Sequence, residues 1–358
     1  MNVQEWVDLG VQNGLVTVSP PQELTFEQVY EKWFVMKLKT IKPQSCDRIE
    51  CCYNRYYAGS WFAAANVSSM DEIMVSRFLT ELIVGRGGIG IKEYRRIYQV
   101  ANNVLVYAKD LKLGGMRLLD WDIIKRYIPE GKYVPNIICK FAVPRSDVCK
   151  MMDLVIHQKI YPLKQSACLC LMLNFFLGLR VGELASLTWR DVDFDAGLLR
   201  VYKTEVKFYP RDENGKKNGT MAYHVMEDTK TFYSVRPLPL VPEAVFILKQ
   251  LKEHHVLRSY DSPYLAYDGS QTVLSRSLDR TLRRLCDLCE VNRFNTHDIR
   301  KTFATMLHDS GMPTRYLSDL LGHSDMITTE RYYILRYKDN YDTLREYMRK
   351  GLYFRPPD

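Results

Sequence analysis

The stretch GLRVGELASLTWRDVD, residues 178–193, places an arginine two positions after a glycine and directly before a run of helix-forming residues. Gly178 is suited to end one helix, and the apolar residues that follow recur at helical spacing. Arg180 is therefore predicted at the break between two rigid helices. A guanidinium held in this way can bind a phosphate through two parallel hydrogen bonds. The alternative is a structural salt bridge from Arg180 to Glu183 or Asp191.

The segments on either side of this stretch indicate the kind of domain that holds it. The preceding run ACLCLMLNFFLGL is too short for a membrane span, which needs about 20 apolar residues, so it predicts a buried helix and no membrane partner. After the break, LLRVYKTEVKFYP and TMAYHVMEDTKTFYSVRPLPLV alternate as strands do, around the turn-rich DENGKKNGT. The helical pattern then resumes. These patterns predict helices around a small antiparallel sheet.

The N-terminal part of the chain is aromatic-rich, and its apolar positions recur every three or four residues, as in a small helical bundle. A segment with three prolines, YIPEGKYVPNIICKFAVPRSD, follows it and has the composition of an extended linker. We therefore predict a mainly α protein of two domains. The predicted parts are an extension (1–20), a helical domain (21–129), a linker (130–145), an α+β domain (146–337) and a tail (338–358).

Charge is the next guide to function. The chain has 50 Lys and Arg against 42 Asp and Glu, a net charge of +8, which favours a polyanionic partner. In the helical domain, lysines and arginines alternate with tyrosines. The cations could bind DNA phosphates and the tyrosine rings could contact sugars or bases. The alternative is an ordinary solvated surface. The cations predicted to contact DNA are Lys37, Lys39, Arg55, Arg95 and Arg96, and the rings are Tyr53, Tyr56, Tyr57, Tyr94 and Tyr98.

Nine cysteines without a regular spacing favour a reduced, cytoplasmic setting, and the first residues show no secretory signal. Cys286 and Cys289 form one C-x-x-C, which suggests zinc or redox chemistry. However, RTLRRLCDLCEV has helical periodicity and no second ligand pair nearby. The pattern predicts buried thiols on a helix, and no metal site.

Two further motifs carry residues suited to phosphate chemistry. TKTFYSVRPLPL places Lys230 before or within a strand, where a lysine is otherwise simply solvated. In THDIRKTFATML, Thr296 or His297 is expected to open a helix, and His297 and Arg300 then share one face at a spacing of three.

The last motif is LGHSDMITTERYY, residues 321–333, in which His323 follows a glycine and two tyrosines follow nine and ten positions later. A core histidine with aromatic neighbours is the alternative interpretation. The Thr pair before the tyrosines is a suitable start for a short helix. The motif therefore predicts a turn that positions a histidine and a helix that presents one tyrosine.

With its arginine, lysine, His-x-x-Arg, Gly-His and tyrosine in this order, the chain resembles the tyrosine recombinase family: the integrases of phages and conjugative transposons, and the Xer-type resolvases. GLRVGEL, HDIR, LGHSD and TTERY are similar to the family's boxes, over roughly residues 143–340. The resemblance implies a helical, SAM-like core-binding domain before the catalytic domain. It also implies double-stranded DNA recombination sites as substrate, a homotetramer on synapsed DNA, accessory directionality or bending proteins, and a bacterial cytoplasmic setting.

The resemblance also implies a role for individual residues. A tyrosine with a pKa near 10 needs a base to accept its proton, and positioned guanidiniums can offset charge that grows on the phosphate. The expected catalytic residues are Arg180 and Arg300 on the phosphate, Lys230 as general acid, His297 as general base, His323 as a phosphate hydrogen-bonding group and Tyr332 as nucleophile. Tyr333 is the rival nucleophile, and Lys203 and Lys207 are rival acids. Since the phosphotyrosyl bond conserves the energy of the broken phosphodiester, no cofactor or metal is expected.

Other functions remain to be weighed. A type IB topoisomerase would use the same chemistry with one protomer, and a non-catalytic DNA-binding protein could keep the same fold. Many transposon integrases have a separate arm-binding domain at the N-terminus; about 20 residues precede the helical domain here, so we expect that domain to be absent or removed. The tail from residue 338 is expected to dock on a neighbouring protomer.

Overall fold

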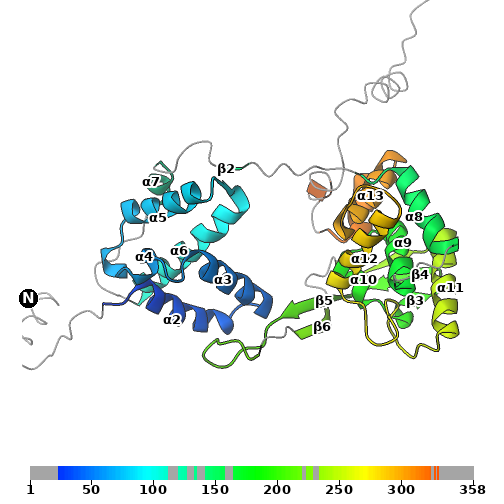
Figure 1. Cartoon of the computed structure of the whole chain (residues 1–358), viewed down its shortest axis with the longest axis horizontal. Coiled ribbons are helices and arrows are strands. Elements are labelled where there is room, and N and C mark those ends of the chain that lie inside the picture. The colour runs from blue at the N-terminus through cyan, green and yellow to red at the C-terminus, as the bar shows by residue number, and fades with distance from the viewer. Residues whose placement is uncertain are drawn as a thin grey trace, which may run out of the picture. The chain divides into compact units, whose positions relative to one another are not determined.

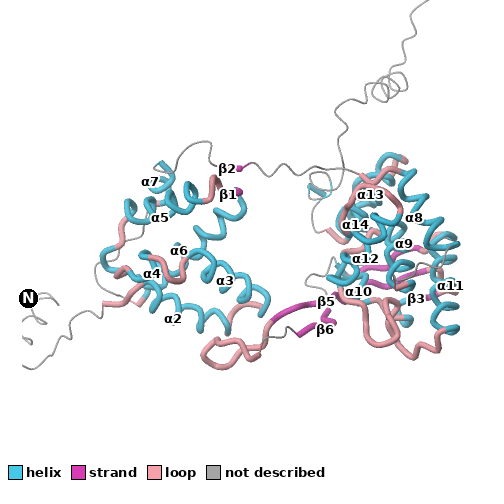
Figure 2. Tube along the Cα trace, viewed as in Figure 1, coloured by secondary structure: helices cyan, strands magenta, loops and turns pink. Residues whose placement is uncertain are grey.

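The computed structural model describes residues 23–111, 120–126, 133–134, 142–157, 164–219, 223–228, 234–323, 326–327 and 329. The chain separates into two compact units: Met1–Ile138 with Lys207–Tyr223, and Cys139–Val206 with His224–Asp358. Helices predominate in both units, and strands are short (Figures 1 and 2). The prediction of a mainly helical protein with a small antiparallel sheet is confirmed.

The first unit is built mainly of helices. Its helices are α2 (Phe26–Leu38), α3 (Pro43–Tyr56), α4 (Trp61–Ala64), η1 (Val67–Ser69), α5 (Glu72–Gly85), α6 (Ile91–Asp110) and α7 (Trp121–Arg126). Two short strands, β1 (Ile89–Gly90) and β2 (Tyr133–Val134), pair in parallel. A capping box between Thr25 and Gln28 begins α2, and the Asp71 carboxylate caps α5.

The core of the first unit is aromatic, which corrects one prediction. Tyr53, Tyr56, Tyr57 and Tyr94 are buried, so these rings are not presented to DNA. The rings of Tyr53 and Tyr30 stack with centroids 3.6 Å apart. The reason is helical spacing: the tyrosines of α3 fall on the face that packs against α2 and α6.

Residues 208–217 lie in the range predicted for the α+β domain, yet they pack on α2 and α3. Arg211 is almost buried and donates hydrogen bonds to Asp47 (2.6 Å) and Glu50 (2.9 Å), both on α3. Gly215 has φ 84°, and an added Cβ would approach the Leu38 side chain to 2.8 Å. Arg211 and Asp47 are 164 positions apart in the chain. This turn is therefore part of the helical unit.

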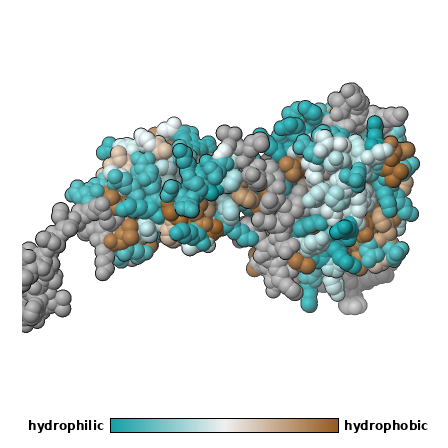
Figure 3. Space-filling model, turned by 90° about the horizontal axis from the view of Figure 1, so that it is seen from below, coloured by the Kyte–Doolittle hydropathy of each residue, from teal (hydrophilic) through white to brown (hydrophobic). Residues whose placement is uncertain are grey.

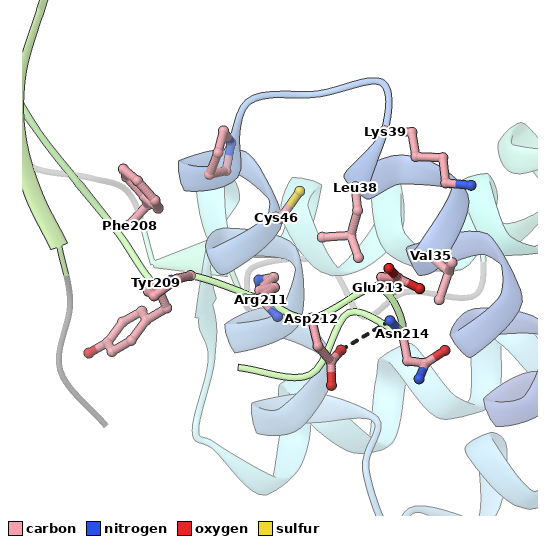
Figure 4. Close-up of a pocket in the computed structure, with 12 residues that line it drawn as sticks. Val35, Leu38, Lys39, Cys46, Phe208, Tyr209, Arg211, Asp212, Glu213 and Asn214 are labelled. Atoms are coloured by element: carbon pink, nitrogen blue, oxygen red, sulfur yellow. Dashed lines mark hydrogen bonds between the residues drawn. The ribbon is translucent and has the colours of Figure 1, made fainter. Parts of the chain in front are cut away.

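A cavity of about 640 Å³ lies beside this turn (Figure 4). Val35 and Leu38 of α2 line it on one side, and the turn from Asp212 to Asn214 lines it on the other. The backbone N–H of Asn214 donates to the Asp212 carboxylate at 3.0 Å, which keeps the turn closed. The cavity wall is thus built by two segments that are distant in sequence.

The second unit consists of helices around a small sheet. Its helices are α8 (Arg145–His157), α9 (Gln165–Leu177), α10 (Val181–Ser186), η2 (Trp189–Asp191), α11 (Pro242–Leu257), α12 (Ser275–Leu288), α13 (Thr296–Asp309) and α14 (Thr314–Leu321). The strands β3 (Val192–Asp193), β4 (Leu198–Val201) and β7 (Arg236–Pro239) form an antiparallel sheet in the order β3-β4-β7. A separate two-stranded sheet pairs β5 (Lys203–Phe208) with β6 (Tyr223–Asp228).

The helix α9 is the centre of the second unit. Nearly all of its residues are buried, and it packs against α8, α11, α12 and α13. An apolar surface on every side of a helix requires partners all around it, as the sequence predicted for this run. Cys286 is buried on α12 and Cys289 is the half-buried C-cap residue of that helix, which confirms the interpretation of helix thiols.

The described surface is mixed in character. On the face drawn in Figure 3, hydrophobic residues are scattered among hydrophilic ones. In the part of the chain that the structure describes, none of the helices has the length and apolar character needed to cross a lipid bilayer.

Candidate active site

Arg180 lies at the junction between α9 and α10, as predicted. Gly178 ends α9 in the left-handed region (φ 60°), and Arg180 is the N-cap residue of α10. The buried side chain of Asn174 fixes the junction, because it accepts from the backbone N–H of Leu179 at 2.7 Å and donates to its carbonyl at 3.2 Å. The guanidinium of Arg180 is thus attached to a rigid corner of the core.

Glu183 is buried beneath the arginines of the site. Its carboxylate accepts from the Arg180 guanidinium at 2.8 Å and from Arg236 at 3.0 Å, and it lies 3.8 Å from Arg300. Burial opposes ionisation, but the charges of Arg236, Arg300 and Arg180 lower the pKa of Glu183 to about 2. Of the two salt bridges considered as the alternative role of Arg180, the one to Glu183 is present, and phosphate binding by Arg180 stays a prediction.

Arg300 projects from α13 and is fully buried. Its guanidinium donates to the carbonyl of Gly178 at 2.8 Å and to the carbonyl of Leu321, and it approaches His323 Nε2 to 3.0 Å. Arg300 therefore connects the end of α9 to the end of α14. Thr296 is the first residue of α13, as one of the two predicted starts, and Asn295 caps it.

His323 follows Gly322, whose φ of 65° ends α14. Burial, together with the charges of Arg300, Arg180 and Arg236, lowers the pKa of His323 to about 3. The ring is therefore neutral at neutral pH. Because a guanidinium can only donate, Nε2 accepts from Arg300, and we infer that the ring proton is on Nδ1, 2.7 Å from the hydroxyl of Thr329.

His297 is the second residue of α13, and its side chain is exposed. Partial desolvation of the ring, followed by the charges of Lys301 and Arg300, lowers its pKa, and Arg180 adds to this effect. The charge of Arg300 thus acts on His297, in agreement with their predicted position on one helix face, and the charge of Arg180 acts on it as well.

The remaining predicted residues are the general acid, the nucleophile and their rivals. Lys230 and Tyr332, and the rival Tyr333, lie outside the described residues. The rival Lys203 is paired with Asp191 at 2.8 Å and bonds Thr188 at 3.0 Å, while Lys207 is exposed and groups with the first unit. Among the described residues, no group of three His, Cys, Asp or Glu side chains is arranged to hold a metal ion.

The cations predicted to contact DNA are all on the helical unit. Lys39, Arg95 and Arg96 are exposed. Arg55 is exposed and lies 3.5 Å from Glu93, and the ammonium of Lys37 lies over the ring of Trp33. Their contact with DNA stays a prediction.

Two residues of the site were not predicted. Arg236 lies in the motif TKTFYSVRPLPL, and the signal that could have indicated its burial is its alternation with Leu238 along a short strand. Thr329 was interpreted as a helix start only. Its buried hydroxyl instead contacts His323.

This fold, with two arginines and a neutral histidine gathered around one helix end, defines a class of DNA strand-breaking enzymes. The model of the phage integrase family matches residues 144–339, and the chain belongs to this family. It is a tyrosine recombinase, an enzyme that cleaves and rejoins DNA.

Relatives and solved structures agree with this assignment. The chain is 24% identical over 342 residues to a XerC-like tyrosine recombinase of Caldanaerobacter subterraneus subsp. tengcongensis, covering 90% of this chain and 82% of that protein. It is 28% identical over 203 residues to the tyrosine recombinase XerA of Thermococcus onnurineus, covering 56% and 59%. Its fold is similar to the Tn1549 transposon integrase bound to transposon right end DNA (TM-score 0.66, 16% identity, 91% and 99% covered). A lambda integrase tetramer on a Holliday junction is also similar (0.59, 13%, 94% and 87%).

Proposed function

We propose that Tyr332 attacks the scissile phosphate of a specific recombination site and forms a 3′-phosphotyrosyl intermediate, which a second strand then resolves. The observation that carries this proposal is the meeting of Arg180, Arg300 and His323 at one turn, shortly before Tyr332 in the sequence. Negative charge grows on the non-bridging oxygens during the attack. Guanidiniums fixed on two different helices can stabilise that charge without reorganising.

Two protons move in this step. The phenol of Tyr332 gives its proton to His297, whose lowered pKa keeps its ring in the basic form at neutral pH. The bond between phosphorus and the 5′ oxygen breaks, and Lys230 protonates the departing oxygen. Lys230 is favoured over Lys203 because the latter is already paired with Asp191.

His323 accepts a hydrogen bond from Arg300 in the structure, so its Nε2 has no proton to donate. To donate to a phosphate oxygen, the ring must take the other tautomer. Thr329 permits this exchange because a hydroxyl can accept from Nδ1–H or donate to Nδ1. We propose that Arg300 transfers its hydrogen bond to the phosphate when DNA binds.

The assembly that we propose is supported by two structural neighbours. The Tn1549 integrase structure contains transposon DNA and the lambda integrase structure is a tetramer on a Holliday junction. We extend both features to this chain: double-stranded DNA as substrate and four protomers in synapsis. We also propose accessory bending or directionality proteins and action in a bacterial cytoplasm, as the resemblance to the family implies. The tail 338–358 is proposed to dock on a neighbouring protomer.

The central experiment uses a nicked DNA substrate that traps the covalent intermediate. The wild-type chain should form an adduct that resists denaturation, Tyr332→Phe should form none, and the matched control Tyr333→Phe should retain it. A chelator should leave the adduct unchanged, whereas a metal nuclease would stop and leave no adduct. A wild-type chain without any adduct on mapped attachment DNA would refute the proposal.

A second pair of assays separates recombination from topoisomerase activity. The recombinase should need a partner site for product, while a type IB topoisomerase would relax supercoils without one. Removal of residues from 338 onward should weaken synapsis but keep binding to a single site. Normal recombination by the shortened chain would contradict the proposed role of the tail.

A further inference from the structure

Three arginines donate hydrogen bonds to three consecutive backbone carbonyls at the end of α14. The pairs are Arg236 Nε with Leu320 (2.6 Å), Arg300 with Leu321, and Arg180 with Gly322 (3.2 Å). These carbonyls lack partners within the helix and carry the negative end of its dipole, so cations stabilise them. The arginines come from β7, α13 and α10, and the turn that they hold carries His323.

Arg236 lies on a strand, whereas Arg180 is the N-cap residue of α10 and Arg300 lies on α13. Arg236 is the first residue of β7, pairs with Val201 of β4 in the sheet, and its side chain is only 6% exposed. Besides Leu320, its guanidinium donates to the carbonyl of Ser234 at 2.9 Å and to the Glu183 carboxylate at 3.0 Å. Arg180 is more open, with a side chain that is 39% exposed, and Arg300, although fully buried, reaches the His323 ring at 3.0 Å. Arg236 is therefore placed to hold Glu183 and the end of α14 together.

The position of Arg236 has an electrostatic consequence. Glu183 and the scissile phosphate are both anions that attract Arg180 and Arg300. Without Arg236, the buried carboxylate would depend on these two arginines alone for compensation, and it would compete with the phosphate for their N–H groups. With Arg236 bound, part of the negative charge of Glu183 is already neutralised.

We propose that Arg236 is a positioning residue for strand cleavage: it binds Glu183 and the Leu320 carbonyl at once, which leaves Arg180 and Arg300 available to the phosphate and holds the His323 turn in place. The inference rests on the proposed recombination function. It assigns to Arg236 an indirect role in strand cleavage, through its effect on Arg180 and Arg300.

The test compares Arg236→Met with Arg200→Met, which removes the same charge from an exposed residue of β4 that lies 3.6 Å from Asp193. Single-turnover cleavage is measured at saturating protein on a nicked substrate, with the DNA dissociation constant recorded for each variant. Outer partners of metal ligands typically contribute on the order of 10- to 100-fold, and by analogy Arg236→Met should slow cleavage by about that factor. Arg200→Met should match the wild type, and both variants should keep the affinity for DNA.

A second substrate separates positioning from misfolding. A methylphosphonate at the scissile position removes the negative charge that the arginines neutralise, so the defect of Arg236→Met should become much smaller on it. A misfolded fraction would instead lower the amplitude of cleavage equally on both substrates, with an unchanged rate constant. Arg236→Lys restores the charge but cannot bond Leu320 and Glu183 together, so it should recover only part of the rate.

The inference fails if Arg236→Met cleaves as fast as Arg200→Met, or if its loss is equal on the two substrates. It also fails if the losses in Glu183→Gln and Arg236→Met simply multiply in the double variant, since the two changes should then act independently. Absence of any adduct with the wild-type chain would refute the proposed function instead, so the two failures are distinguishable.

Discussion

Replacement of Gly178 by alanine tests how the structure holds the catalytic corner. Gly178 has φ 60°, and an added Cβ would lie 2.2 Å from the ring of Phe303. The left-handed conformation costs a non-glycine residue about 1–2 kcal/mol. Overpacking a core typically adds about 1–3 kcal/mol. Gly178→Ala should therefore destabilise the second unit by about 2–5 kcal/mol.

Gly197→Ala is the matched control. Gly197 has nearly the same backbone angle, φ 63°, but no atom lies within 4 Å of the added Cβ. It should cost only the conformational part, about 1–2 kcal/mol. The measurement is urea unfolding followed by hydrogen exchange in peptides of α9, which reports on the second unit alone. Equal destabilisation by the two variants would refute the packing of Phe303 against this corner.

Other predictions concern charge and pH. Arg211→Met should destabilise the helical unit by about 3 kcal/mol, the low end for breaking a buried pair, because a lysine remains near Glu50. The pairing with Arg211 and Lys217 outweighs burial and lowers the pKa of Glu50, so urea unfolding should show this loss shrink as Glu50 becomes protonated in acid. The pKa of His323 is about 3 in the folded protein and 6.5 ordinarily, so the unfolded chain binds a proton that the folded protein does not, and stability falls as the pH is lowered from 6.5 toward 3. In His323→Gln, the melting temperature should therefore depend less on pH over this range. Thr329→Val should remove the hydroxyl that contacts His323 Nδ1, and the NMR chemical shift of that ring nitrogen should change. An unchanged chemical shift would contradict the contact.

Local patterns in the sequence predicted much of the second unit. The glycine that ends α9, the arginine at the start of α10 and the start of α13 each follow from neighbouring residues, because helix caps and breaks are local chemistry. The order of the motifs then indicated which of these residues meet.

Long-range pairing was beyond such patterns. Nothing near Arg211 indicates that its partner Asp47 lies 164 positions earlier, and nothing near Arg236 indicates Glu183. The tyrosines of α3 looked suited to DNA because cations surround them. Their burial depends on which helix face meets α2 and α6, which is a property of the assembled core.

The central claim is that one phenol oxygen near the C-terminus becomes bonded to DNA phosphorus beside the arginine cluster. Peptide mass spectrometry of the trapped adduct tests it most directly. The account predicts a nucleotide remnant on Tyr332, with none on Tyr333, and loss of that peptide signal in Arg300→Ala. A remnant on a serine or on Tyr333, or cleaved DNA without any attached peptide, would contradict it.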